Sequence, residues 1–224
     1  MAISHCPKEE SPKNKLLSKG AAALSDAELR AIFLRTGLPG ITAIELGRSL
    51  LSEFGGIRPL LSARQAAFFG CKGLGPAMFT QLQADLELTT RYCKEELRAK
   101  PIFTSPQLVR DYLTVKMRDY QREVFVLLLL DSRHQLLDFH ELFQGTIDMA
   151  NVYPREIVKL ALQNNAAAVI VAQNHPSRAA EPSQSDIAIT KRIKQALALV
   201  DIRLLDHFIV GRGKVTWLAA TGQM

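Results

Sequence analysis

Four side chains near the C-terminal end of the sequence combine residue types that bind metals and activate water. Gln173 and His175 stand two positions apart, and Ser183 and Asp186 follow across a short polar segment. Imidazole and carboxylate groups bind Zn²⁺, which lowers the pKa of a bound water to about 7 and prepares it to attack a carbonyl carbon. His175 and Asp186 supply two such ligands, and Gln173 places a carboxamide where a third would be expected.

The second half of this pattern has two interpretations. Ser183 and Asp186 have the spacing of a capping box, in which the serine accepts a hydrogen bond from a backbone amide at a helix start. In the metal interpretation, Asp186 binds the ion and Ser183 donates a hydrogen bond to the bound water or to an oxyanion. Ser183 can serve in both, whereas Asp186 is expected to serve mainly in one.

Gln173 determines how much of a zinc site survives. A carboxamide oxygen is a neutral ligand that binds zinc more weakly than imidazole, and it has no second ring nitrogen through which neighbours could orient it. The sequence therefore predicts a weakened site that is empty, completed by water, or occupied by a harder ion.

Glu141 is the candidate general base. Strand geometry with a period of two places Leu137, Phe139, Glu141 and Phe143 on one face, where apolar neighbours would tune the carboxyl group. The alternative places Glu141 in solvent near the end of its strand. Among the other histidines, His207 is predicted to pack within a core strand.

A glycine pair marks a second candidate site in the first half of the chain. Gly73-Leu74-Gly75 has the glycine-hydrophobic-glycine order of a helix-hairpin-helix turn, in which exposed backbone amides hold a DNA phosphate. Nearby Lys72 favours this interpretation. The alternative is a plain turn between two helices that uses glycine for its backbone conformation.

The chemistry-bearing segment resembles a known signature. With histidine at position 173 it would read His-x-His-Pro-x6-Ser-x2-Asp, which resembles the motif of JAMM metallopeptidases, the zinc-dependent MPN domains. Further segments, spread over essentially the whole chain, resemble the bacterial RadC-like family: Ala23–Leu29, Leu34–Gly37, Leu142–Thr146, Val152–Glu156, Asn174–Ser177 and Leu205–His207.

This resemblance implies a fold and two alternative functions. The fold is an α/β JAMM/MPN-type domain, with a central mixed sheet flanked by helices, preceded by a small all-α, helix-hairpin-helix-like domain. The first function is zinc-dependent hydrolysis of a peptide or isopeptide bond, with Gln173, His175 and Asp186 as metal positions and Glu141 and Ser183 as catalytic positions. The alternative is a catalytically impaired scaffold that binds DNA, with Gly73 and Gly75 at the contact, or protein partners, in DNA repair or recombination.

Composition sets the wider limits. The chain has 224 residues, 47% of them hydrophobic, a net charge of +6 and three cysteines without CxxC spacing. These values predict a folded cytoplasmic protein with reduced thiols and no membrane span, and they permit a polyanionic partner. Exposed sheet edges would also allow the α/β domain to pair with itself.

Hydrophobic periodicity places the motifs on secondary structure. Residues 21–93 have helical spacing interrupted by glycine-rich turns, and a charged, proline-bearing stretch then sets a domain boundary near residue 101, giving domains 1–100 and 101–224. Beyond it, strands alternate with helices, and Ala166–Ala172 is a buried strand that leads directly into the candidate site. Helices are predicted at Pro154–Asn164 and Gln184–Val200, and further strands at Glu123–Asp131, Gln135–Phe143, Ile202–Val210 and Lys214–Ala219.

Overall fold

The computed structural model describes residues 11–102, 106–117, 120–144, 152–176, 180–211, 214–222 and 224. The chain divides into two compact units, Met1–Glu87 and Leu88–Met224. The division falls inside helix α6 (Pro76–Ala99), earlier than the boundary near residue 101 that the composition predicts. The charged stretch after Tyr92 continues this helix instead of forming a linker. None of the described helices is both long and apolar enough to cross a membrane.

The first unit is built from short helices around its own apolar core. Its elements are α1 (Pro12–Lys19), η2 (Ala21–Ala23), α2 (Asp26–Leu34), α3 (Ala43–Phe54), α4 (Ile57–Leu61), α5 (Gln65–Gly70) and the start of α6. A capping box of Ser25 and Glu28 begins α2. Helices α2 and α3 approach closely at Gly47, where a Cβ atom would lie 2.9 Å from the carbonyl oxygen of Ala27.

The second unit has a five-stranded mixed sheet, as the resemblance implies. The strands are β1 (Val124–Leu130), β2 (Leu136–Gln144), β3 (Ala168–Asn174), β4 (Arg203–Val210) and β5 (Val215–Trp217), in the spatial order β2-β1-β3-β4-β5. The β3–β4 pair is parallel, and the other neighbouring pairs are antiparallel. A short η4 turn (Ala219–Thr221) follows β5.

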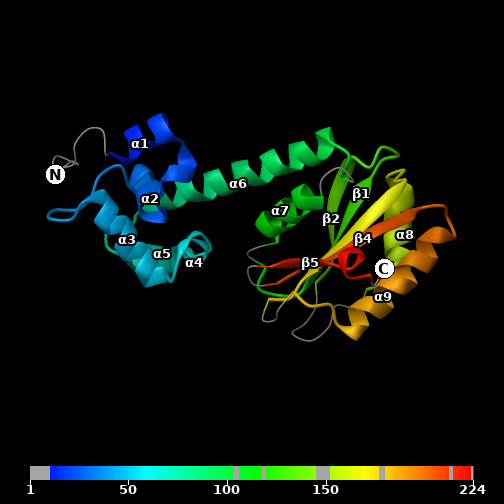
Figure 1. Cartoon of the computed structure of the whole chain (residues 1–224). Helices are drawn as coiled ribbons and strands as arrows, with labels where there is room; N and C mark the ends of the chain where they lie inside the picture. The colour runs from blue at the N-terminus through cyan, green and yellow to red at the C-terminus, as the bar shows by residue number, and fades with distance from the viewer. Residues whose placement is uncertain are drawn as a thin grey trace. The chain divides into compact units, whose positions relative to one another are not determined.

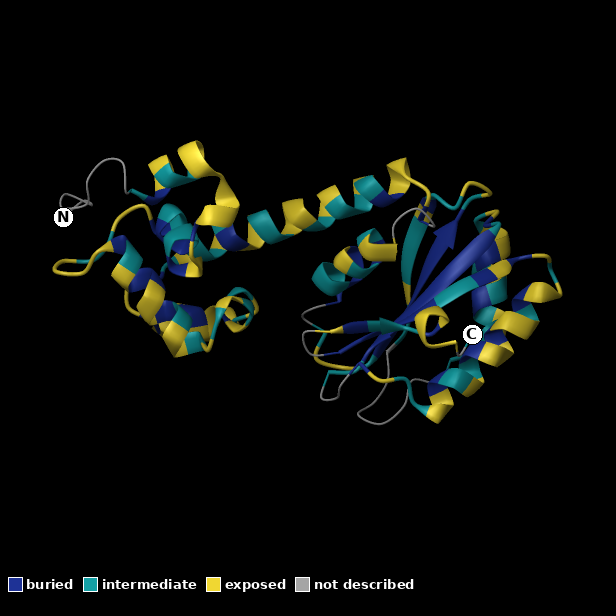
Figure 2. Ribbon diagram, in the orientation of Figure 1, coloured by how far each residue is buried: buried dark blue, intermediate teal, exposed yellow. Residues whose placement is uncertain are grey.

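Helices cover both faces of this sheet (Figure 1). Helices α8 (Pro154–Gln163) and α9 (Gln184–Ala198) pack on the face that carries Phe125 and Val171. Helix α7 (Pro106–Lys116) and the end of α6 pack on the opposite face. Figure 2 shows the central strands buried between these layers, which explains why β1 and the first five residues of β3 are continuous apolar runs.

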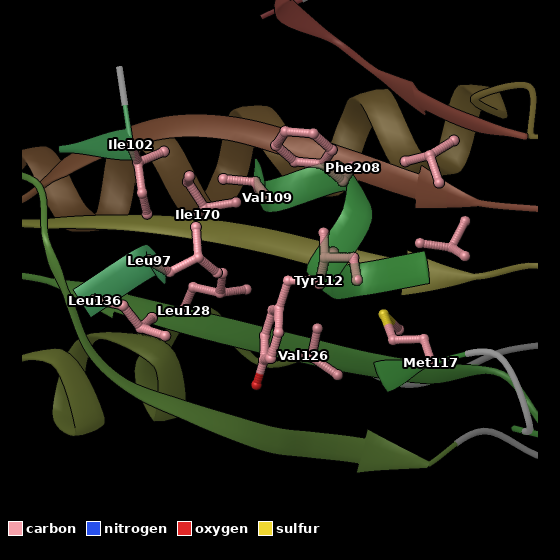
Figure 3. Packing of buried hydrophobic residues seen from close by; sticks show 14 of the residues in the cluster. Leu97, Ile102, Val109, Tyr112, Met117, Val126, Leu128, Leu136, Ile170 and Phe208 are labelled. Atoms are coloured by element: carbon pink, nitrogen blue, oxygen red, sulfur yellow. The ribbon is translucent and has the colours of Figure 1, made fainter. Parts of the chain in front are cut away.

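The core on the α7 face anchors this helix to the sheet. Figure 3 shows Val109 and Tyr112 of α7 lying over the strands that carry Val126, Leu128 and Ile170, and all five side chains are almost fully buried. Tyr112 also contacts Phe139 of β2 edge to face, with ring centroids 5.7 Å apart. Burial of this kind contributes about 25 cal/mol per Å² of apolar surface, so α7 holds the sheet on which the candidate site depends.

Candidate metal centre

The candidate site lies at the carboxyl end of β3. Gln173 and Asn174 are the last two residues of the strand, and both are buried. The backbone amide of His175 donates to the carbonyl oxygen of Val210 (2.8 Å), which extends the parallel pairing with β4 by one residue. β3 is the central strand of the sheet. Ligands of α/β folds commonly bind just beyond the carboxyl ends of such strands.

Strand pairing brings Glu123 into the site. β1 and β3 are antiparallel with Phe125 opposite Gln173. Continued by two residues, this register places Glu123 opposite His175, and the period of two puts all of them on the same face of the sheet. Sequence reasoning did not identify Glu123. The signal available was an acidic residue immediately before a buried strand, but its meaning depends on the order of strands in the sheet.

Helix α9 supplies the third side of the site. Ser183 caps the helix and forms a complete capping box with Asp186: the Asp186 amide donates to Ser183 Oγ (3.1 Å), and the Ser183 amide donates to Asp186 Oδ2 (2.7 Å). Oδ1 of the same carboxylate accepts a hydrogen bond from Gln173 (2.6 Å). Asp186 thus completes the capping box through Oδ2, while Oδ1 bonds to Gln173, and its role as a metal ligand stays a prediction. Ser183 Oγ also lies 2.8 Å from Ser185 Oγ.

The carboxamide nitrogen of Gln173 is the centre of the cluster. Nε2 lies 2.6 Å from Asp186 Oδ1, 2.8 Å from His175 Nε2 and 3.3 Å from Glu123 Oε1. The side chains of His175 and Asp186 are 9% exposed, and that of Glu123 is 23% exposed. One buried amide group thus lies between two carboxylates and an imidazole.

Hydrogen-bond chemistry fixes the direction of these contacts. An NH₂ group only donates, and ionised carboxylates only accept, so Gln173 is oriented with its nitrogen toward Asp186 and Glu123. His175 Nε2 must then accept, which leaves the ring proton on Nδ1. Nδ1 is buried and has no hydrogen-bond partner among the described residues. The NH₂ group offers two hydrogens to three acceptors, so the contacts with Asp186, His175 and Glu123 are not all hydrogen bonds at the same time.

Zinc does not fit this arrangement. His175 Nε2 lies 3.6 Å from Asp186 Oδ2 and 3.7 Å from Glu123 Oε1, whereas two ligands of one tetrahedral zinc ion lie about 3.3 Å apart. The distances from His175 Nε2 to the two carboxylates are thus close to those between metal ligands. The space between these three groups, however, is occupied by the NH₂ group of Gln173. Within the described ranges, no group of three or more His, Cys, Asp and Glu side chains is placed to hold a metal ion.

A buried chain of hydrogen bonds connects Asp186 of the cluster to His207 on β4. Thr190 Oγ1 donates to the carbonyl oxygen of Asp186 (2.5 Å) and therefore accepts from His207 Nδ1 (2.6 Å). His207 is fully buried on β4 and packs edge to face against Phe125. Burial lowers the pKa of His207 to about 4, and the charge of Asp186 acts in the opposite direction. His207 thus has the core position that the sequence predicts.

Asn174 holds the segment that carries Glu123. Its Oδ1 accepts from the Val124 amide (2.7 Å), and its Nδ2 donates to the carbonyl oxygens of Arg122 (2.9 Å) and Tyr120 (3.4 Å). The neighbouring carboxamide of Gln173 points to the other side of the strand. Asn174 therefore positions the backbone on both sides of Glu123.

Glu141, the predicted base, lies on the opposite face of the sheet. It pairs with Val126, and its carboxylate contacts the Tyr120 hydroxyl and lies 3.8 Å from Lys116 Nζ. A β-bulge between Phe125 and Val126 shifts the register, so Phe143 packs on the α8 and α9 face while Phe139 packs on the other. The expectation that one face carries both Phe139 and Phe143 is corrected, and Glu123 is the carboxylate that the structure brings to Gln173.

The glycine pair forms the turn between α5 and α6. Gly73 has φ +87°, and a Cβ atom there would lie 3.1 Å from Leu46 and 3.2 Å from Leu38, whereas Gly75 has open space. Leu74 is buried in the helical core between them. Two exposed cations precede Gly73: Lys72 lies in the turn itself, and Arg64 lies at the N-terminal end of α5.

Two other histidines among the described residues do not join the site. His134 contacts Arg203 (2.7 Å), and His140 lies 3.2 Å from Asp138. Gly145, Thr146 and Ser177, which belong to the motifs quoted for the family resemblance, lie outside the described residues.

Two family models match this chain and show which class of protein it belongs to. Residues 103–223 match the family model described as RadC-like JAB domain, and residues 3–80 match the model described as UPF0758 N-terminal. The α/β unit is therefore a JAB domain, of the JAMM/MPN type, joined to a characteristic helical unit.

The relatives extend this assignment to the whole chain. A UPF0758 protein of Marinomonas sp. (strain MWYL1) is 57% identical over 99% of both chains, one of Tolumonas auensis is 58% identical, and one of Azotobacter vinelandii is 56% identical, each over the same share. The chain belongs to the RadC-like UPF0758 family.

Proposed function

We propose that this chain is a binding scaffold built on the JAB fold, in which the hydrolase-like site does not hold zinc and the helical unit contacts DNA. The observation that carries the proposal is the position of Gln173 Nε2 between Asp186, His175 and Glu123. An N–H donor repels a cation, so the centre of the cluster favours anionic and imidazole acceptors over a metal.

Metal content tests the first part of this proposal. Untagged protein purified without chelator is compared with His175→Ala by elemental mass spectrometry. We expect zinc to be far below one ion per chain in both proteins. Near-stoichiometric zinc that is lost in His175→Ala would contradict the proposal.

The helical unit supports the DNA part. Gly73 has the left-handed backbone conformation of a tight turn, and Leu74 anchors the turn in the core. The exposed Lys72 lies in the turn, and the exposed Arg64 lies at the N-terminal end of α5. Backbone amides and cationic side chains at such a turn suit a phosphate. Contacts of this type fix position on the DNA without reading its sequence.

Salt dependence of DNA binding tests this part on the full chain. Binding of a short duplex is measured over a series of salt concentrations, because phosphate contacts release counterions. Replacing both Arg64 and Lys72 by alanine is expected to weaken binding and to reduce the slope of log K against log salt by about 2. The matched control replaces Lys191 and Arg192, two exposed cations of α9, by alanine. Equal effects of the two double variants would remove the proposed DNA contact.

Zinc-dependent hydrolysis of a peptide or isopeptide bond is the second candidate. The observation that favours it is the convergence of His175, Asp186 and Glu123 at near-ligand spacing. It requires Gln173 to turn its carboxamide oxygen toward an ion. Metal-dependent cleavage that is abolished by His175→Ala would establish this candidate, and cleavage that survives the substitution would exclude it.

A further inference from the structure

The Gln173 carboxamide connects three parts of the chain that are far apart in sequence. It bonds to Glu123 before β1, to His175 after β3 and to Asp186 in the first turn of α9. Gln173 itself is 5% exposed and lies on the central part of the sheet, between β1 and β4. A cross-link of this kind between an acidic residue, an imidazole and a second acidic residue is the arrangement that a bound cation usually provides.

We propose that the carboxamide of Gln173 takes the place of a metal ion and holds this cluster together. The two carboxylates and the imidazole are arranged as acceptors around a common point, and Nε2 supplies hydrogen atoms at that point. This inference deepens the proposed function, because it states what stabilises the site when no zinc is bound.

Charge explains why a donor is needed at this position. Asp186 and Glu123 each lie within 3.7 Å of His175 Nε2. Within the described part of the chain, Asp186 forms no ion pair with Lys or Arg, and its other partner is the Ser183 amide of its own capping box. Acceptors without a donor repel each other in a partly buried site. The partial positive charge of the amide hydrogens relieves this repulsion without adding a net charge.

Geometry explains why a carboxamide suffices. Asp186 Oδ2 is already fixed by the Ser183 amide, so only Oδ1 turns toward the centre. Thr190, which bonds to His207, also bonds to the backbone carbonyl of Asp186 and so fixes the first turn of α9. The fold therefore holds the acceptors in place. The carboxamide of Gln173 needs only to donate hydrogen bonds to them.

The first test replaces the donor by an acceptor of nearly the same shape. Gln173→Glu adds a third carboxylate and removes both N–H groups. We expect the melting temperature to fall by about 5 °C or more relative to the natural chain, and to recover on addition of Zn²⁺ or Mn²⁺, which the natural chain does not require. The matched control is Gln163→Glu, because Gln163 is exposed on α8. A Gln173→Glu protein as stable as the control without metal would overturn the proposal.

The second test creates a metal ligand at the same point and does not depend on the first variant folding. Gln173→His is expected to bind about one zinc per chain and to melt about 5 °C higher in saturating zinc than in chelator. Adding His175→Ala to this variant is expected to abolish the binding, and Gln163→His is the control. Absence of zinc binding by folded Gln173→His would show that the carboxamide does not stand at a metal position.

The two proposals fail in different ways. Absence of salt-sensitive DNA binding by the natural chain would contradict the proposed scaffold alone, whereas zinc in the natural chain would contradict both proposals. Unchanged stability of Gln173→Glu, or absence of zinc in Gln173→His, would contradict the replacement of a metal by the carboxamide, whatever the chain binds.

Discussion

Gln173 and Asn174 carry the same functional group and do different things with it. Successive strand residues point to opposite faces, so Gln173 faces the acidic cluster while Asn174 faces the backbone of residues 120–124. A carboxamide has both donors and an acceptor. Gln173 therefore bridges the side chains of the cluster. Asn174 instead forms hydrogen bonds with backbone groups of residues 120–124, as a neighbouring strand would.

His207 is expected to make the JAB domain sensitive to acid. Burial lowers its folded-state pKa to about 4 from the usual 6.5. The unfolded chain therefore binds a proton first, so the stability that the neutral ring contributes is present above pH 6.5 and is lost as pH falls toward 4. The loss amounts to about 3 kcal/mol. Urea unfolding at several pH values measures it.

His207→Gln separates this effect from the titration of carboxylates. Glutamine keeps a polar group beside Thr190 but does not titrate, so the variant is expected to be less stable at pH 7 and to lose less stability between pH 6.5 and 4. Equal pH slopes for the natural chain and the variant would show that His207 does not carry the acid sensitivity.

The parts of the site that come from one stretch of sequence were predictable, and the others were not. Gln173, His175, Ser183 and Asp186 follow one another within 14 positions of the sequence, so their spacing alone indicated a common site. Glu123 reaches the cluster because β1 lies beside β3 in the sheet. Residue patterns report local periodicity and do not report strand order, so they favour Glu141 as the acidic residue and do not indicate Glu123.

The same limit applies to whole elements. Alternating strands and helices after residue 101 predicted the α/β class, and the mixed sheet confirms it. The β-bulge opposite Phe125 was not predictable, because an extra residue in one strand leaves its hydrophobic composition unchanged. That single shift places Glu141 and Phe143 on different faces. The helix start at Ser183 was predictable because capping chemistry is local.

The side chain of Asn174 is expected to stabilise the contact between the end of β3 and the start of β1. Asn174→Ala leaves the buried Val124 amide without its acceptor and the Arg122 carbonyl without its donor. An unsatisfied buried group costs about 1–3 kcal/mol, so we expect a loss of about 3 kcal/mol in the free energy of unfolding. Urea denaturation gives this value directly.

Asn164→Ala is the matched control. Asn164 donates one side-chain hydrogen bond to the Leu160 carbonyl oxygen at the end of α8 and is only half-buried. Its loss is expected to cost about 1 kcal/mol. If both variants lose the same stability, Asn174 acts as an ordinary polar residue and does not hold the segment around Glu123.

The two units have separate apolar cores. The helical unit packs around Leu46, Leu50 and Phe68, whereas both cores of the JAB unit lie against the sheet. The single tryptophan of the chain, Trp217, stacks on Phe208 in β4 with ring centroids 5.8 Å apart. Its fluorescence therefore reports on the JAB unit, while far-UV circular dichroism reports on helices in both.

Gly73→Ala is expected to destabilise the helical unit alone. Its φ of +87° is unfavourable for alanine, and the added Cβ would press on Leu38 and Leu46, at a cost of about 1–2 kcal/mol. The circular dichroism melt should begin at lower temperature while the Trp217 midpoint stays unchanged. Gly70→Ala, which has open space and no positive φ, is the control. A Trp217 midpoint that falls together with the helical signal would show that the two cores unfold as one.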